Sequence, residues 1–122
     1  MTKSVNDLVL DGAFEVLDAG NIMTACSALP TTRTEAITTY KLADIALTPV
    51  TDFTKADGDT NGRKCTIAQK AAVDIDTSGT AINIAVCDGT NLLYVTECTS
   101  QVLTAGGTVT FPAWDIEIAD PT

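Results

Sequence analysis

The sequence TAINIAVCDGTNLLYVTEC, residues 80–98, is the stretch that decides the fold of this chain. Apolar β-branched residues occupy alternate positions from Ile82 to Val86, which is the period of a strand with one buried face. Asp88-Gly-Thr-Asn91 combines residue types that favour a tight turn, and 92–98 is again rich in apolar residues. The stretch predicts two antiparallel strands joined by a turn.

The same alternation of strand and turn signals continues on both sides of this hairpin. Turn clusters at 57–62, 77–79 and 105–107 separate short segments rich in Val, Ile and Thr. The pattern of residues 34–40 fits either a short helix or an irregular loop. Further strands are expected at 22–28, 44–47, 51–55, 63–69, 72–76, 99–103 and 108–118, the last bent at Pro112. We expect a single domain over residues 1–122, mainly β, with an antiparallel β-sandwich or barrel whose core spans 44–119.

Residues 4–19 predict one N-terminal α-helix. Its apolar residues recur at steps of three and four, in the order Val5, Leu8, Val9, Gly12, Ala13, Val16 and Leu17. Ser4 is expected to cap the helix, with Asp7 in the first turn, and Gly20 to end it. The apolar stripe can cover a face of the domain's own sheet, which we expect, or dock on a partner.

The composition excludes several classes of function. Seven Lys and Arg against 16 Asp and Glu give a net charge of −9, whereas nucleic-acid binders need a surplus of cations. The chain has no His, which removes the commonest general base and metal ligand. It also lacks the GxSxG, P-loop and GxGxxG motifs. We therefore expect a protein that is not an enzyme and has no cofactor, with 21 Thr residues suiting a β-rich surface.

The sequence gives no signal for a membrane. No apolar run approaches the roughly 18 residues that a spanning helix needs. Asp7, Asp11 and Glu15 interrupt the N-terminal segment, so it lacks the continuous apolar region of a signal peptide. We expect synthesis in the cytosol and no membrane partner.

Four cysteines, Cys26, Cys65, Cys87 and Cys98, are widely spaced and form no CxxC pair. They are open to three interpretations: buried reduced side chains, disulfides within or between subunits, or a zinc site that would need all four thiolates. In the strand 80–87, Cys87 lies with Ala81, Asn83 and Ala85 on the less apolar face. We expect the Cys87 thiol to be available to a partner.

The turn cluster DGDTNG begins like a calcium-binding loop. Asp57, Asp59 and Asn61 place oxygens at alternating positions, and Gly62 can make the sharp turn. Position twelve, however, is Ala68 in place of the usual bidentate Glu, and the flanking residues predict strands. The cluster therefore fits a polar hairpin turn, with weak calcium binding as the alternative.

Apolar and acidic residues alternate most regularly in the sequence PAWDIEI near the C-terminus. Trp114, Ile116 and Ile118 share one face, and Asp115 and Glu117 share the other. One interpretation is a sheet strand with its Trp in the core. The other is an edge strand that pairs with another subunit, for which Trp114, Ile116 and Ile118 are the interface candidates.

The second half of the chain contains a set of short stretches that are familiar together. They are FTKADGD (53–59), GRK (62–64), SGTA (78–81), Asp88-Gly89, LLYV (92–95), LTAGGTV (103–109) and PAWDIEIADP (112–121). In these stretches the chain resembles small structural proteins in the virions of tailed bacteriophages. The resemblance covers roughly residues 34–121, is weaker over the N-terminal helix, and includes no catalytic motif.

The resemblance implies a β-rich protein that decorates or links capsid subunits and stabilises the particle. Its partners would be the major capsid protein or other virion proteins, with further copies of itself in a homo-oligomer. A neck, collar or tail-fibre component is the alternative, and a small glycan- or calcium-binding β-module is another. A virion is made in the host bacterial cytoplasm and persists outside it, where disulfides between subunits would be stable.

Overall fold

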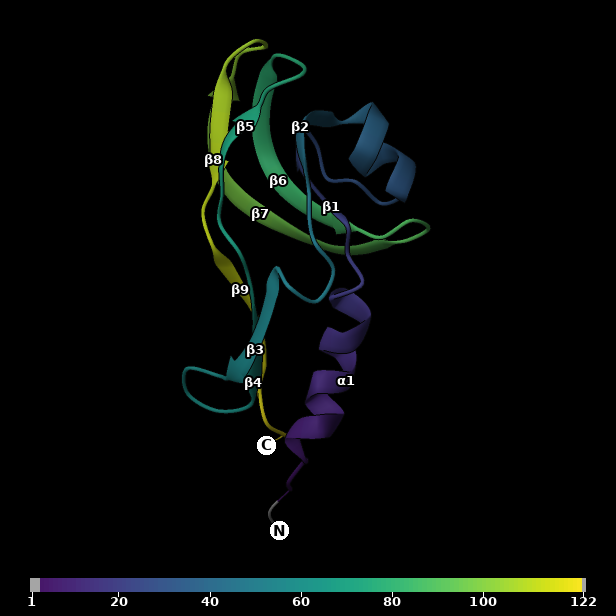
Figure 1. Cartoon of the computed structure of the whole chain (residues 1–122), viewed down its shortest axis with the longest axis vertical. Helices are drawn as coiled ribbons and strands as arrows, with labels where there is room; N and C mark the ends of the chain where they lie inside the picture. Colours follow the sequence, from purple (N-terminus) through teal and green to yellow (C-terminus); the bar gives the residue numbers. More distant parts are fainter. Residues whose placement is uncertain (1–2, 122) are drawn as a thin grey trace.

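The computed structural model describes residues 3–121 and is mainly β, with antiparallel sheets and one α-helix near the N-terminus (Figure 1). This confirms the expected sandwich-like fold class. The elements, in chain order, are α1 (Asp7–Leu17), β1 (Ile22–Cys26), a π-helical turn η1 (Glu35–Thr39), β2 (Lys41–Ala46), β3 (Phe53–Asp57), β4 (Arg63–Ile67), β5 (Lys70–Asp74), β6 (Gly79–Cys87), β7 (Leu92–Leu103), β8 (Thr108–Phe111) and β9 (Trp114–Ile118).

Three sheets make up the β-structure of the described residues. The largest has the order β2-β1-β6-β7, the second the order β3-β4-β9, and β5 pairs with β8. The hairpin between β6 and β7 turns at Asp88, whose backbone N–H donates to the Asn91 carbonyl at 3.1 Å. A bridge between Ala43 and Ile75 links β2 to the chain after β5.

The expected core boundaries are too narrow at their N-terminal side. Strand β1 precedes residue 44, yet it lies between β2 and β6 and pairs with both. Met23 of β1 is fully buried in the main core, together with Phe53 of β3 and Ile67 of β4. The core therefore extends to the N-terminal side of residue 44, because β1 pairs with the edge of β6 that β7 leaves free.

The prediction that Cys87 is available to a partner is wrong. Ala85 and Cys87 do share a face of β6, but η1 packs on that face through Ala36, and both residues are fully buried. Ile84 and Val86 face the main core on the opposite side of the sheet. Residues 34–40 form this covering turn, so the segment that the sequence left open decides the accessibility of Cys87.

Helix α1 is shorter than the sequence predicts and has a different cap. Asn6, not Ser4, caps it, since the Asn6 side-chain carbonyl accepts a hydrogen bond from the Leu8 N–H at 2.8 Å. After Leu17 the chain passes through Gly20, where an added Cβ would lie 2.8 Å from Cγ1 of Val86. That close approach fixes the end of the helix against the large sheet.

The helix lies at the end of the molecule that holds β3, β4 and the C-terminus (Figure 1). Phe14 and Leu17 are its buried residues, and both belong to the main core. The contacts of α1 are mainly with β4 and β7. The described part of the chain thus covers one side of the helix and leaves its other side exposed.

Candidate protein-binding face

The uncovered side of α1 carries large apolar side chains. Leu8, Val9 and Val16 are 76 %, 67 % and 65 % exposed. They lie on one side of the helix together with Gly12 and Ala13, and we name these five residues the apolar stripe. Isolated apolar side chains on a surface are ordinary, but a contiguous group marks an interaction site.

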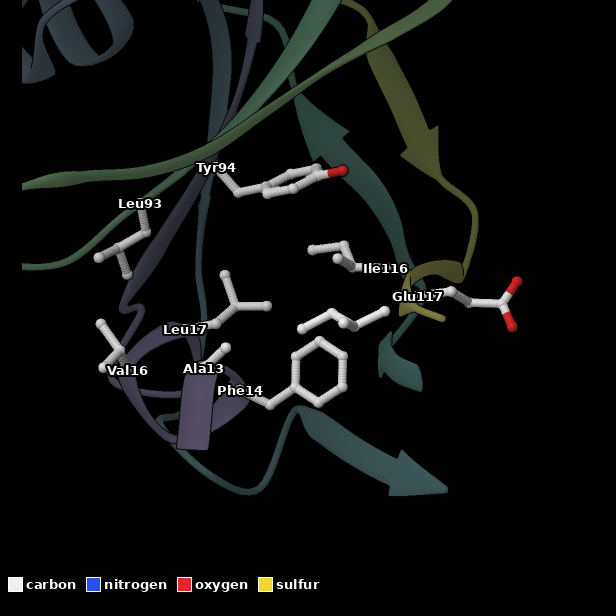
Figure 2. A pocket seen from close by; sticks show the side chains of 9 residues that line it. Ala13, Phe14, Val16, Leu17, Leu93, Tyr94, Ile116 and Glu117 are labelled. Atoms are coloured by element: carbon white, nitrogen blue, oxygen red, sulfur yellow. The ribbon is translucent and has the colours of Figure 1, made fainter. Parts of the chain in front are cut away.

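A groove of about 310 Å³ continues the apolar stripe towards the sheets (Figure 2). Figure 2 shows Leu17 and Ile116 pointing into the groove from opposite sides, with Leu93 and Tyr94 above them and Glu117 turned outward. Ala13 and Val16 belong to both the stripe and the groove. The groove is lined by Ala13, Phe14, Val16, Leu17, Leu93, Tyr94, Ile116, Glu117 and Ile118.

Four carboxylates run along the other border of the apolar stripe. Asp7, Asp11, Glu15 and Asp18 recur at steps of three and four, and we name them the acidic edge. Asp11 pairs with Arg63 of β4 at 2.9 Å, and Asp18 pairs with Lys55 of β3 at 2.9 Å. Within residues 3–121, Asp7 and Glu15 have no such ion pair, so the edge keeps a net negative charge.

The ion pairs of the acidic edge also set the rotation of the helix. The hydrogen bonds that Arg63 donates to Asp11 and Asp57, together with the nearby charge of Asp7, raise the pKa of Arg63 above its ordinary range. The hydrogen bond to Asp18 raises the pKa of Lys55. Since both cations belong to the sheet β3-β4-β9, they hold the acidic edge against it and turn the apolar stripe outward.

The interface candidates of β9 contribute to this face unequally. Ile116 is 7 % exposed and, with the half-buried Ile118, lines the groove. Trp114 is half-buried against Tyr94, with ring centroids 5.9 Å apart. Its Nε1–H is buried without a hydrogen-bond partner in the described part of the chain. The structure thus brings Ile116 and Ile118 to the groove, while Trp114 packs beside it.

The four cysteines are not brought together as one cluster. Cys26, Cys65 and Cys87 are buried, Cys98 is half-buried, and all four thiols are free. Burial raises the pKa of each thiol, that of Cys65 to about 11. Cys98 lines a second groove, of about 210 Å³, between β7 and β8. Thiols with a raised pKa are poor nucleophiles, and Cys98 alone among the four is partly exposed, so reaction with a reagent is expected first at Cys98.

The residues of the calcium-like loop lie in the turn between β3 and β4, as expected for a polar hairpin. Their oxygens have other partners: Asp57 pairs with Arg63 at 2.8 Å, and Asp59 with Lys64 at 2.7 Å. The side-chain carbonyl of Asn61 accepts from the backbone N–H of Asp120 at 3.0 Å. Asp57 and Asp59 therefore tie the hairpin to its own strand β4, and Asn61 ties it to the C-terminal segment.

The sequence predicts a helix whose apolar residues, Leu17 among them, cover the domain's own sheet, with docking on a partner as the alternative. In the structure Leu17 is buried, whereas Leu8, Val9 and Val16 are exposed. The signal that points the other way is a second apolar series, Leu10, Phe14 and Leu17, which lies next to the first on the helix. Phe14 and Leu17 are the buried pair. A helix with two adjacent apolar faces and one acidic edge can pack on its own domain and still present an apolar surface.

Comparisons with known proteins add no identification. No protein-family model, no curated protein and no solved structure matches the chain. Within residues 3–121, no helix has the length and apolar character that a membrane crossing requires.

Proposed function

We propose that this chain is a non-enzymatic structural protein of a bacteriophage particle, which decorates or links capsid subunits and stabilises the shell. The observation that carries the proposal is the exposure of Leu8, Val9 and Val16 beside an apolar groove. The placement in a phage particle comes from the resemblance of residues 34–121 to virion proteins. The apolar stripe and the groove together are the attachment face.

An attachment role gives this exposed apolar surface a physical reason. Burial of one Leu or Val side chain contributes about 1.5–3 kcal/mol, part of which association itself consumes. One such face gives a modest affinity. In a shell, many copies engage at once, so weak individual contacts suffice.

The attachment is non-covalent in this proposal. Disulfides between subunits need accessible thiols, and Cys26, Cys65 and Cys87 are buried. Cys98 is the one cysteine with partial exposure, and it lies in the groove between β7 and β8, away from α1. Covalent links between copies would therefore have to run through Cys98.

A neck, collar or tail-fibre component is the alternative within the same class. The apolar face serves either position, and the number of copies per particle separates them. Hundreds of copies would place the chain on the capsid, and a small multiple of three, six or twelve would place it at the neck or tail.

The test is quantitative mass spectrometry of purified particles from the phage that encodes the chain. We expect the wild-type chain in the particles, and the double variant Leu8→Gln/Val16→Gln to be depleted about tenfold or more. Val102→Gln is the matched control, because Val102 is 76 % exposed on β7 and does not line the groove. Absence of the wild-type chain from the particles would overturn the proposed function.

A further inference from the structure

We infer that the attachment face binds an amphipathic α-helix of a different protein, apolar on one side and bordered by Lys and Arg. This inference rests on the proposed function and names the partner of the same face. Three features carry it: the spacing of the apolar stripe, the groove that adjoins it, and the charge along its border.

The spacing of the apolar stripe suits a helix. Leu8, Gly12 and Val16 follow one another at steps of four and form a ridge along α1. Gly12 lies in the middle of this ridge, and a Cβ built there meets no atom within 4 Å. The ridge thus has a notch at its centre, into which the ridge of a second helix can pack at close distance.

The groove supplies the place for an anchoring side chain. It opens beside Ala13 and Val16, and Leu17 and Ile116 point into it from opposite sides. Helices that bind grooves insert a few large apolar residues at i, i+3, i+4 and i+7. One such residue of the partner enters the groove when the rest of its apolar side lies on the apolar stripe.

The negative charge along the border of the apolar stripe favours a partner with positive charge. The acidic edge has four carboxylates, and within residues 3–121 two cations, Lys55 and Arg63, pair with it. Arg63 is also shared with Asp57. The remaining negative charge favours Lys or Arg on the flank of the incoming helix. A second copy would bring the same acidic edge and a further net charge of −9, so self-pairing is disfavoured.

The test uses the full chain and two designed helical peptides in fluorescence anisotropy. Both peptides carry Leu at the same i, i+3, i+4 and i+7 positions, one with Lys and the other with Glu on the flanks. We expect the Lys peptide to bind about tenfold or more tightly than the Glu peptide, with an affinity that falls as salt rises. Val16→Gln should abolish binding of the Lys peptide.

Charge reversal separates the face from general attraction to an acidic protein. The variant Glu15→Lys should weaken binding of the Lys peptide and strengthen binding of the Glu peptide. The matched control Asp74→Lys changes the net charge equally at an exposed position on β5 that does not line the groove, and should have little effect. Equal losses in the two variants would overturn the inference, because they would show non-specific attraction.

The remaining outcomes of the peptide test also bear on the inference. Failure of both peptides to bind would overturn the inference that the partner is a helix. If the chain then self-associates in sedimentation, and Val16→Gln abolishes it, a second copy is the occupant. Neither result changes whether the chain is found in particles, so failure of this inference is distinguishable from failure of the proposed function.

Discussion

Arg63 of β4 donates its Nε–H to Oδ1 of Asp11 on α1 at 2.9 Å, and the two side chains are 17 % and 15 % exposed. The two residues are 52 positions apart in the chain. The same guanidinium donates from Nη1 to Asp57 at 2.8 Å. This ion pair joins the acidic edge to the sheet and leaves the apolar stripe on the outside.

Replacing Arg63 by Met should loosen α1 and leave the large sheet intact. The variant removes the donors of Asp11 and leaves its half-buried carboxylate without a partner. Hydrogen exchange followed by mass spectrometry should show faster exchange of the α1 amides and unchanged exchange in β6 and β7. Lys64→Met is the matched control, because Lys64 pairs with Asp59 and Asp115, which lie outside the helix. Equal exchange of α1 in both variants would contradict this role of Arg63.

Replacing Gly12 by Ala should stabilise the free chain and weaken attachment. The site is inside a helix, and the new methyl group meets no atom within 4 Å. Alanine loses less conformational entropy than glycine when the helix forms, so the free energy of unfolding, measured in urea, should rise by about 0.5–1 kcal/mol. The methyl group fills the notch of the apolar stripe, so binding of the Lys-flanked peptide should fall. A variant that is more stable and binds as well as wild type would show that the notch is not part of the contact.

The thiols should react in two classes. In the native chain the partly exposed thiol of Cys98 should react with a disulfide reagent, and the other three only after unfolding in guanidinium chloride. Cys98→Ser should remove the reaction of the native chain, whereas Cys87→Ser should leave it unchanged. Electrophoresis should give the same monomer band with and without reductant. A disulfide-linked band that persists in Cys98→Ser would refute the placement of the other three thiols.

Asp88 should stabilise the fold in a pH-dependent way. Hydrogen bonds from the N–H groups of Asn91 and Thr90, at 2.6 and 2.7 Å, hold its pKa below the ordinary value of 3.8. Because the folded chain prefers the charged form, this stabilisation is present above the ordinary pKa. It is lost as the pH falls through the lowered pKa of the folded state.

The measurement is urea unfolding of wild type and Asp88→Asn between pH 2 and pH 7. The wild type should be the more stable near neutral pH, and the difference should vanish well below about pH 4. Subtracting the free energy of unfolding of the variant from that of the wild type removes the effect that both share, the loss of repulsion between carboxylates as they are protonated in acid. A difference that is constant over the whole range would contradict the lowered pKa of Asp88.

The sequence was informative wherever local chemistry decides the structure. The turns at 57–62, 77–79, 88–91 and 105–107 lie where Gly, Asp, Asn and Ser cluster, and the strands lie between them. The helix was placed to within a few residues, although Asn6 caps it and not Ser4. Residues 92–98 and 99–103, expected as separate strands, are one strand, β7, since no turn residue separates them.

The candidate site was harder to predict because its parts come from distant elements. The apolar stripe was visible in the sequence, but its direction was not, since α1 has a second apolar face in Leu10, Phe14 and Leu17. The groove needs β7 and β9 beside the helix, and no local pattern gives that neighbourhood. The alternation of strand β6 predicted the correct face for Cys87. It predicted the wrong exposure, because η1 covers that face.

By itself, the sequence determined the class of fold, the positions of strands and turns, and the net charge of −9. Those properties depend on backbone preferences and composition, which act over a few residues. Only the tertiary structure decided which face of α1 is buried and which thiols are accessible. Both follow from contacts between remote segments, Arg63 with Asp11 and η1 with β6, and burial is a property of such contacts and not of any one segment.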